Sequence, residues 1–208
     1  MNSEERIKAA ARKVFHQKGY AGTRTRDIAE EAGINHAMVN YYFRSKEKLF
    51  QIVMIETMTY FFQGISAILN EETTSLEQKI EQVVAKYIDL LLEEPELPTF
   101  VFNEVRTNPE PFIENSPIYK ALQNSVLARQ YAEAVARGEV SEPNLLQMVL
   151  NVISLVIFPF IAQPILIALN KIDNDQYKAL ILERKKLIPQ WIKAMLFVGE
   201  KSENKRSI

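Results

Sequence analysis

The sequence predicts an all-α fold. Glycine and proline are scarce, with 6 and 9 residues among 208, and no proline occurs before Pro95. Long stretches of the chain can therefore form helices that are interrupted only at glycines and polar turns. Apolar residues also recur at helical spacing, as between Glu4 and Lys18, where they lie three or four positions apart. A hydrophobic content of 47% is enough for the cores of one or two domains.

Each helix is predicted from its apolar spacing and from the residues that end it. Gly19 ends the first helix, and five prolines divide the stretch 93–117 into short pieces. The predicted helices cover residues 4–18, 25–32, 36–42, 45–69, 76–92, 116–136, 145–158 and 173–198, with one or two helical turns at 99–106.

The motif that organises the chain is TRDIAEEAGINHAMVNYYFRSKEKL, at residues 25–49. Its first helix has a narrow apolar stripe, formed by Ile28, Ala29 and Ala32. Gly33 can adopt the positive φ that commonly ends a helix, and Asn35 is a good N-cap for the helix that begins at His36. Ser45 is predicted to cap the longer helix that follows. With Val39 fixing the second helix, this spacing is that of a helix-turn-helix.

The second short helix is predicted to have one apolar and one outward side. Met38 or Val39, together with Tyr42, forms the apolar side. The outward side consists of His36, Ala37, Asn40 and Tyr41. For His36 two interpretations stay open, namely an exposed recognition-helix side chain and a partner in local capping.

Lys46 and Lys48 lie in the first turn of the longer helix, where basic side chains oppose the helix dipole. A bound phosphate would reverse that effect, with Lys46 as the first candidate for the contact. The alternative is that both lysines are solvated surface charges.

The stretch from Ile7 to Phe50 resembles the N-terminal DNA-binding domain of the TetR family of bacterial transcriptional regulators, with the motif TRDIAEEAGINHAMVNYYFRSKEKLF. The resemblance implies that residues 25–32 support the motif, that residues 36–42 recognise DNA and that Lys46 touches the DNA backbone. The family often has Tyr where this chain has Asn40, so a bidentate contact to adenine and a shorter phosphate contact both stay open. The predicted DNA-contacting residues are Arg24, Thr25, Arg26, Asn35, His36, Ala37, Met38, Asn40, Tyr41, Tyr42 and Lys46.

Charge is distributed unevenly along the chain. Residues 1–50 hold ten Lys and Arg against six Asp and Glu, whereas the other 158 residues hold 15 against 20. This asymmetry is expected when only one end meets DNA. We therefore predict a helix-turn-helix DNA-binding domain at 1–47, a helical effector-binding and dimerisation domain at 48–200, and a frayed tail at 201–208.

Composition argues against several other classes of protein. The chain has no Cys and only two His, so Cys-ligated zinc, thiolate catalysis and a His-based site are disfavoured, and we expect neither enzymatic activity nor a cofactor. The apolar stretch 143–169 is too interrupted for a membrane span, by Gln147, Asn151, Gln163 and two prolines. No signal peptide precedes the charged first helix, and the expected location is the cytoplasm.

The last two long helices are apolar on more than one face, which is typical of a domain core or a subunit interface. In the TetR family the corresponding helices pair with their copies in a four-helix bundle. The resemblance therefore implies a homodimer, and the candidate interface residues are Leu155, Leu187 and Trp191.

A small-molecule site carries a weaker signal. Aromatic side chains are frequent in the middle helices, where the resemblance implies an effector cavity, although such residues also form ordinary cores. Glu104, with Arg106, is either a polar anchor for a ligand or part of a surface ion pair. The candidate effector residues are Met58, Phe61, Phe62, Tyr87, Phe100, Phe102, Glu104 and Tyr119, and their character favours a largely apolar ligand.

The sequence thus predicts a ligand-responsive regulator, most simply a repressor that binds a palindromic double-stranded DNA operator as a homodimer. The alternative is a DNA-binding regulator without an effector, which is controlled by its abundance or by a protein partner.

Overall fold

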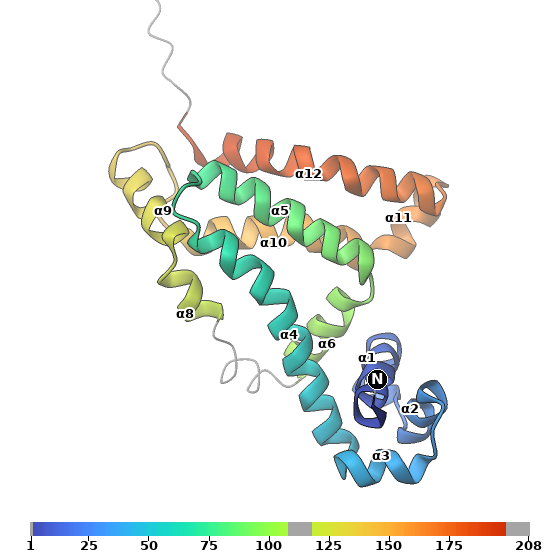
Figure 1. The fold of residues 1–208 in the computed structure, drawn as a ribbon. Coiled ribbons are helices and arrows are strands. Elements are labelled where there is room, and N and C mark those ends of the chain that lie inside the picture. The colour runs from blue at the N-terminus through green and yellow to red at the C-terminus, as the bar shows by residue number, and fades with distance from the viewer. Residues whose placement is uncertain (1, 108–117, 199–208) are drawn as a thin grey trace, which may run out of the picture. The chain divides into compact units, whose positions relative to one another are not determined.

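The computed structural model describes residues 2–107 and 118–198, except for the side chains of residues 61, 63 and 118–120. The chain forms two compact units, one of Met1–Gly64 and Glu93–Pro117 and the other of Ile65–Leu92 and Ile118–Ile208. The regular elements in the described ranges are helices, which confirms the predicted all-α class (Figure 1). The predicted tail at 201–208 and the predicted helix start at 116 lie outside the described residues.

The first unit contains the N-terminal helices and a later one. Its elements are α1 (Ser3–Gly22), α2 (Thr25–Ala32), α3 (His36–Phe43), the start of α4 (Lys46–Asn70) and α6 (Leu97–Thr107). In α1, Asn2 and Glu5 form a reciprocal capping box, and Gly19 breaks the helix with a φ of 67° where the sequence predicts its end. The domain boundary predicted after residue 47 stays a prediction, since α4 continues from one unit into the other.

Aromatic rings join α1, α4 and α6 in the core of the first unit. The ring centroids of Phe15 and Phe50 lie 5.0 Å apart, and those of Phe50 and Phe100 lie 5.8 Å apart. Both pairs meet edge to face, an arrangement that aromatic rings favour. Helix α6 therefore packs in the same unit as the helix-turn-helix, although it comes much later in the chain.

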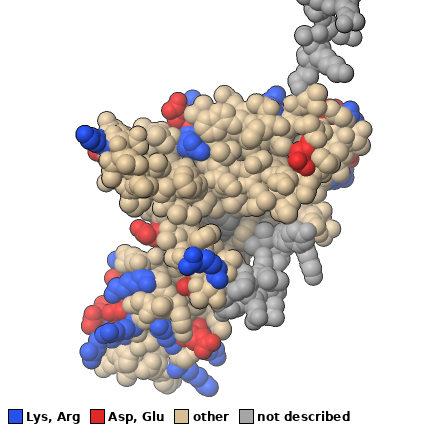
Figure 2. Space-filling view, turned by 180° about the vertical axis from the view of Figure 1, so that it is seen from behind, with Lys and Arg blue, Asp and Glu red and all other residues tan. Residues whose placement is uncertain are grey.

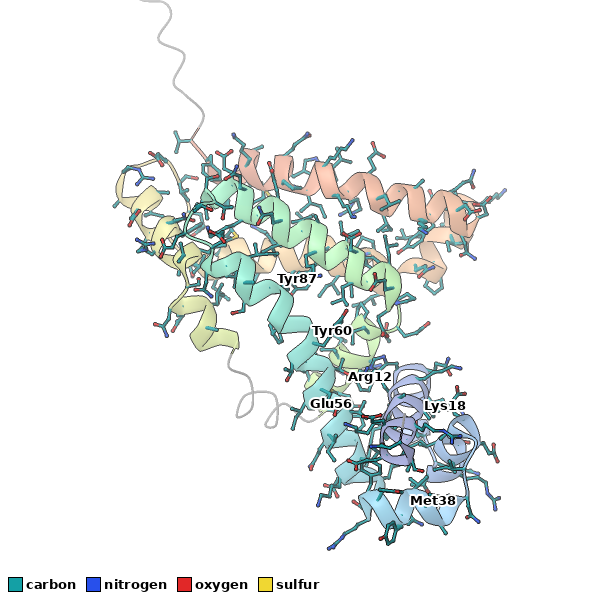
Figure 3. All side chains as sticks on the ribbon, in the orientation of Figure 1. Arg12, Lys18, Met38, Glu56, Tyr60 and Tyr87 are labelled. Carbon is teal, nitrogen blue, oxygen red and sulfur yellow. The ribbon has the colours of Figure 1, made fainter. Side chains whose placement is uncertain are left out.

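Polar contacts support this core. The carboxylate of Glu56 on α4 accepts from Lys8 at 2.6 Å and from Arg12 at 3.3 Å, both on α1 (Figure 3). His16 is buried, with its ring centroid 4.7 Å from that of Phe100 and its Nδ1 3.3 Å from a carboxylate oxygen of Glu94. Burial lowers the pKa of His16, and the nearby Glu94 only partly opposes that effect.

The second unit contains the remaining helices, namely α5 (Leu76–Glu93), α8 (Ile118–Gln123), α9 (Val126–Ala136), α10 (Leu145–Ile161), α11 (Gln163–Asn170) and α12 (Asn174–Leu196). The single helix predicted over 116–136 is wrong. The chain is interrupted between α8 and α9, because Ser125 is extended and its hydroxyl accepts from the Ala128 N–H as an N-cap.

Pro159 lies inside α10 and does not end it. A proline lacks an N–H, so the carbonyl of Leu155 loses its partner in the helix. Arg184 of α12 supplies the missing donor, with its Nη2 2.8 Å from that carbonyl. The Tyr177 hydroxyl donates to the Pro159 carbonyl at 3.1 Å, and burial raises its pKa to about 12. Two side chains of α12 thus stabilise the proline-containing part of α10.

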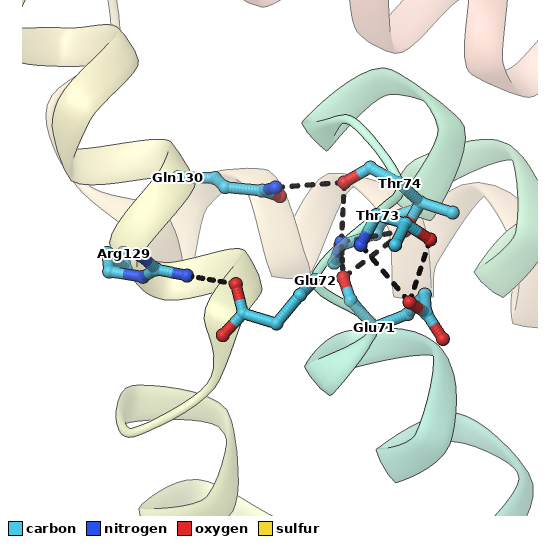
Figure 4. A network of polar contacts seen from close by, with 7 residues as sticks. Glu71, Glu72, Thr73, Thr74, Arg129 and Gln130 are labelled. Atoms are coloured by element: carbon cyan, nitrogen blue, oxygen red, sulfur yellow. Dashed lines mark hydrogen bonds and ion pairs between the residues drawn. The ribbon is translucent and has the colours of Figure 1, made fainter.

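The turn between α4 and α5 is held by a buried ammonium group. Lys79 is fully buried, and its Nζ donates to the carbonyl of Glu71 and to both the carbonyl and the hydroxyl of Thr74. From α9, Gln130 donates to the same Thr74 carbonyl at 2.8 Å, and Arg129 pairs with Glu72 at 2.5 Å (Figure 4). These contacts tie α9 to the turn within the second unit.

Two stretches of the described residues are long and apolar enough to cross a membrane by length and composition alone. They are α4, and α10 and α11 taken together across a bend of 65°. In α4, Leu49 and Val53 are buried among the helices of the first unit, so protein already covers this side. The bend between α10 and α11 falls next to Pro164, where the sequence predicts an interruption.

Candidate nucleic-acid interface

The turn between α2 and α3 is formed by three residues. Gly33 has a φ of 63°, in the left-handed region that favours glycine, and its N–H donates to the Glu30 carbonyl at 3.1 Å. Ile34 donates to the Ala29 carbonyl at 3.0 Å, and the Asn35 side chain accepts from the Ala37 N–H at 2.9 Å. Both predicted caps of this turn are confirmed, and they fix where α3 begins.

The buried face of α3 differs in part from the prediction. Val39 and Phe43, four positions apart, are buried, and they lie on one side of the helix. Tyr42 does not belong to that apolar side, since 40% of its surface is exposed. The correction arises because Phe43 takes the place in the core that helical spacing also allowed for Tyr42. Tyr42 is therefore accessible, as its predicted DNA contact requires.

The other face of α3 is open to solvent. His36, Ala37 and Asn40 are exposed, Met38 is half-buried, and Tyr41 is 81% exposed with its ring set edge-on to that of Tyr42. The helix lies across the end of the first unit, and its side chains project from it (Figure 3). The predicted recognition residues therefore share one accessible surface.

Basic side chains lie beside this surface, at the ends of the neighbouring helices. They are exposed, and they are Arg24, Arg26, Arg44 and Lys48. Figure 2 shows that Lys and Arg are interspersed with Asp and Glu over the first unit, so the charge is not of one sign. Arg24 precedes α2, where the Asp27 carboxylate accepts from its N–H at 2.9 Å, and this bond lowers the pKa of Asp27.

Lys46 has an internal role that the sequence did not indicate. Its Nζ donates to the carbonyls of Tyr20 at 2.8 Å and Thr23 at 3.0 Å, and it lies 4.1 Å from the centroid of the Tyr20 ring. An ammonium has three N–H donors, so one remains for a phosphate. Lys46 thus ties the start of α4 to the segment between α1 and α2, whereas Lys48 is exposed.

The candidate effector residues are divided between the two units and differ in their exposure. Phe100 is packed in the aromatic core of the first unit, Phe102 is exposed, and Glu104 accepts from the Tyr20 N–H at 3.5 Å. Met58 and Phe62 are half-buried in the first unit, while Tyr87 lies in the second, where burial raises the pKa of its hydroxyl. The side chains of Phe61 and Tyr119 lie outside the described residues.

The candidate interface residues lie in the second unit. Leu155 and Leu187 are half-buried, and Trp191 is 38% exposed, with the guanidinium of Arg184 over its ring at 5.2 Å. Residues 145–170 contain no charged side chain. The large apolar residues that are exposed on this stretch are Leu146, Leu150, Ile153, Phe158, Ile161, Ile165 and Leu169. Figure 2 shows few charged side chains on the face of this unit that it presents.

Two short helices joined at Gly33, with an open second helix, define a protein of the helix-turn-helix class. Residues 7–53 match the family described as "Bacterial regulatory proteins, tetR family". This N-terminal part of the chain is therefore the DNA-binding domain of the TetR family of transcriptional regulators.

Two relatives are described as a helix-turn-helix transcriptional regulator and repressor. The "Probable HTH-type transcriptional regulator YttP" of Bacillus subtilis is 27% identical over 166 residues, which cover 77% of this chain and 78% of that protein. The "HTH-type transcriptional repressor NicS" of Pseudomonas putida is 35% identical over 102 residues, 49% of this chain and 48% of that protein.

Solved structures share the fold. A regulatory protein of the tetR family from Rhodococcus RHA1 superposes with a TM-score of 0.70 at 20% identity, over 96% of this chain and 100% of that one. The regulator FadR from Bacillus subtilis, in complex with stearoyl-CoA, has a TM-score of 0.66 at 20% identity, over 92% of this chain and 98% of that one.

Proposed function

We propose that this protein is a repressor that binds a palindromic operator as a homodimer and inserts α3 into the major groove. The observation that carries the proposal is the solvent-exposed face of α3, with His36, Asn40 and Tyr41 accessible on a helix whose start is fixed by two caps. A helix presented in this way fits the major groove of B-DNA. The proposal implies a location in the cytoplasm, where operator DNA is found.

Within this proposal the contacts divide into two kinds. Arg24, Arg26 and Lys46 would meet phosphates, because they lie at helix ends beside α3. The outward residues of α3 would contact base edges. They are His36, Ala37, Met38, Asn40, Tyr41 and Tyr42. The Asn35 side chain accepts a hydrogen bond as the N-cap of α3, so a contact of Asn35 with DNA would use its backbone.

The division can be tested with fluorescent operator DNA selected from a randomised library. Removing a phosphate contact should weaken binding to every sequence and reduce the slope of log K against log salt by about 0.9. Tyr41→Ala and His36→Ala should instead change which sequence is preferred. Glu81→Ala, on an exposed face of α5, is a suitable control. If the α3 variants bound every sequence equally less well, α3 would not be the recognition helix.

The homodimer is proposed from the uncharged, exposed face of α10 and α11. Leu150 is 47% exposed there and is a sharper probe than half-buried Leu155 or Leu187. Leu150→Asp should give monomers, since burying a carboxylate without a partner is strongly unfavourable. Gln82→Asp adds the same charge to an exposed position of α5 and should leave the dimer intact. Sedimentation at micromolar concentration measures both, and a wild-type monomer would refute the proposal.

A small apolar effector is the finer part of the proposal. FadR was solved with stearoyl-CoA, whose acyl chain is apolar although its coenzyme A part is charged, so stearoyl-CoA is a first probe for an apolar site in this chain. Saturation at 100 times Kd would raise stability by about 2.7 kcal/mol. Release of DNA should be blunted in Phe61→Ala and Phe62→Ala, which change the part of α4 that continues into the second unit. The alternative, a regulator without an effector, would be favoured if no apolar ligand shifted either stability or DNA binding.

A further inference from the structure

One contact joins the first residues of the two helices of the motif. The hydroxyl Oγ1 of Thr25, at the start of α2, lies 2.7 Å from Nε2 of His36, at the start of α3. The start of α2 is itself held, because the Asp27 carboxylate accepts from the Arg24 N–H at 2.9 Å. The imidazole of His36 is therefore attached at one edge to a fixed point on a neighbouring helix.

This attachment decides which ring nitrogen is free. Imidazole has two nitrogens, and the bond to Thr25 uses Nε2, so Nδ1 is the nitrogen left for an outside partner. If the Thr25 hydroxyl donates to Nε2, the neutral ring carries its proton on Nδ1. If the ring is protonated, Nε2–H donates to Thr25 and Nδ1 again carries a proton. Both of these states present an N–H donor at Nδ1. In the other neutral tautomer Nε2–H donates to Thr25, and Nδ1 is then an acceptor. A preference for guanine therefore requires that the Thr25 hydroxyl is the donor when the ring is neutral.

We propose that Thr25 is a positioning residue that orients His36 and thereby sets the preference of the protein at one base pair. The inference rests on the proposed role of α3 in the major groove. An N–H donor at Nδ1 suits the acceptor edge of guanine, which offers O6 and N7. Without the hydroxyl of Thr25 the ring can turn about its side-chain bonds, and the donor loses its fixed direction.

The competing role for Thr25 is a direct contact to phosphate, and the two roles predict different results. A phosphate contact acts on all sequences alike. A residue that acts through His36 acts only at the base pair that His36 contacts. Thr25→Val keeps the branched shape but removes the hydroxyl, whereas Thr25→Ser keeps the hydroxyl and removes a methyl group.

The experiment is selection from a randomised operator library, with the full-length wild type, Thr25→Val, Thr25→Ser, His36→Ala and the Thr25→Val, His36→Ala double variant. The wild type and Thr25→Ser should prefer guanine at one base pair of each half-site, by about 5- to 10-fold for a single directed hydrogen bond. Thr25→Val should lose that preference at the base pair where His36→Ala loses it. In the double variant, Thr25→Val should have no further effect on preference. Circular dichroism establishes that each variant is folded.

Two results would overturn the inference. One is a Thr25→Val variant that binds all sequences less well with its preference unchanged, which is the behaviour of a phosphate contact. The other is a Thr25→Val variant that matches the wild type. The proposed function fails separately, namely if the wild type enriches no sequence or if His36→Ala and Tyr41→Ala both leave the preference intact.

Discussion

Replacing Lys46 by Met should destabilise the first unit, whether or not DNA is present. The substitution keeps most of the apolar stem but removes the ammonium that donates to the carbonyls of Tyr20 and Thr23 at 2.8 and 3.0 Å. Hydrogen bonds from a charged donor contribute about 1.5–3 kcal/mol each, and a cation over a ring adds about 0.5–1 kcal/mol. The two bonds share one partly exposed ammonium, so we expect a loss of about 2–3 kcal/mol in total.

Lys48→Met is the matched control, because it removes the same charge two residues further along α4. Lys48 is exposed, and within residues 2–107 and 118–198 its ammonium has no hydrogen bond. Its removal should change the stability by less than about 0.5 kcal/mol.

Native-state hydrogen exchange of α1 and α4 amides measures the stability of the first unit directly. Trp191, the single tryptophan, lies in the second unit. Its fluorescence follows the unfolding of that unit and serves as an internal reference. A loss below about 0.5 kcal/mol in Lys46→Met would refute the structural role of its ammonium. A simultaneous fall of about 0.9 in the salt slope of DNA binding would show that its third N–H meets a phosphate.

Two further predictions concern buried polar groups. His16 has a pKa in the folded protein below the 6.5 of the unfolded chain, so the unfolded chain binds a proton more readily. The first unit should therefore lose stability as pH falls below about 6.5, and His16→Phe should flatten that dependence in urea titrations at pH 5–8; an unchanged slope would contradict it. Arg184→Met should lower the free energy of unfolding by about 2 kcal/mol, because it leaves the Leu155 carbonyl unpaired. The same substitution should cost far less in a Pro159→Ala background, because the alanine restores an N–H for that carbonyl. Equal costs in both backgrounds, measured by urea unfolding, would exclude this account.

Features that depend on neighbours in sequence were predictable. Gly33 and Asn35 act as caps, and Ser45 accepts from the Lys48 N–H at 3.1 Å, because each effect is decided within three or four residues. The helical class and the main elements follow from apolar spacing, which is also local.

The features that were missed depend on contacts between distant segments. Helical spacing cannot say whether Tyr42 or Phe43 enters the core, since both lie three or four residues from Val39. The internal role of Lys46 requires the position of Tyr20, which is 26 residues away. The Thr25–His36 contact had one available signal, namely that both residues begin helices across a short turn.

The first unit is made of two separate segments of the chain, and this affects how it folds during synthesis. Helix α6 belongs to the first unit, but the segment Ile65–Leu92, which comes before it in the chain, belongs to the second unit. Until α6 has emerged from the ribosome, the rings of Phe50 and His16 lack Phe100, their partner in the core. Bringing the two segments of the first unit together closes a loop of this length, at a cost of about 3 kcal/mol in chain entropy. The contacts of α6 have to offset that cost. The nascent DNA-binding unit therefore stays incomplete until the chain has been translated past Thr107.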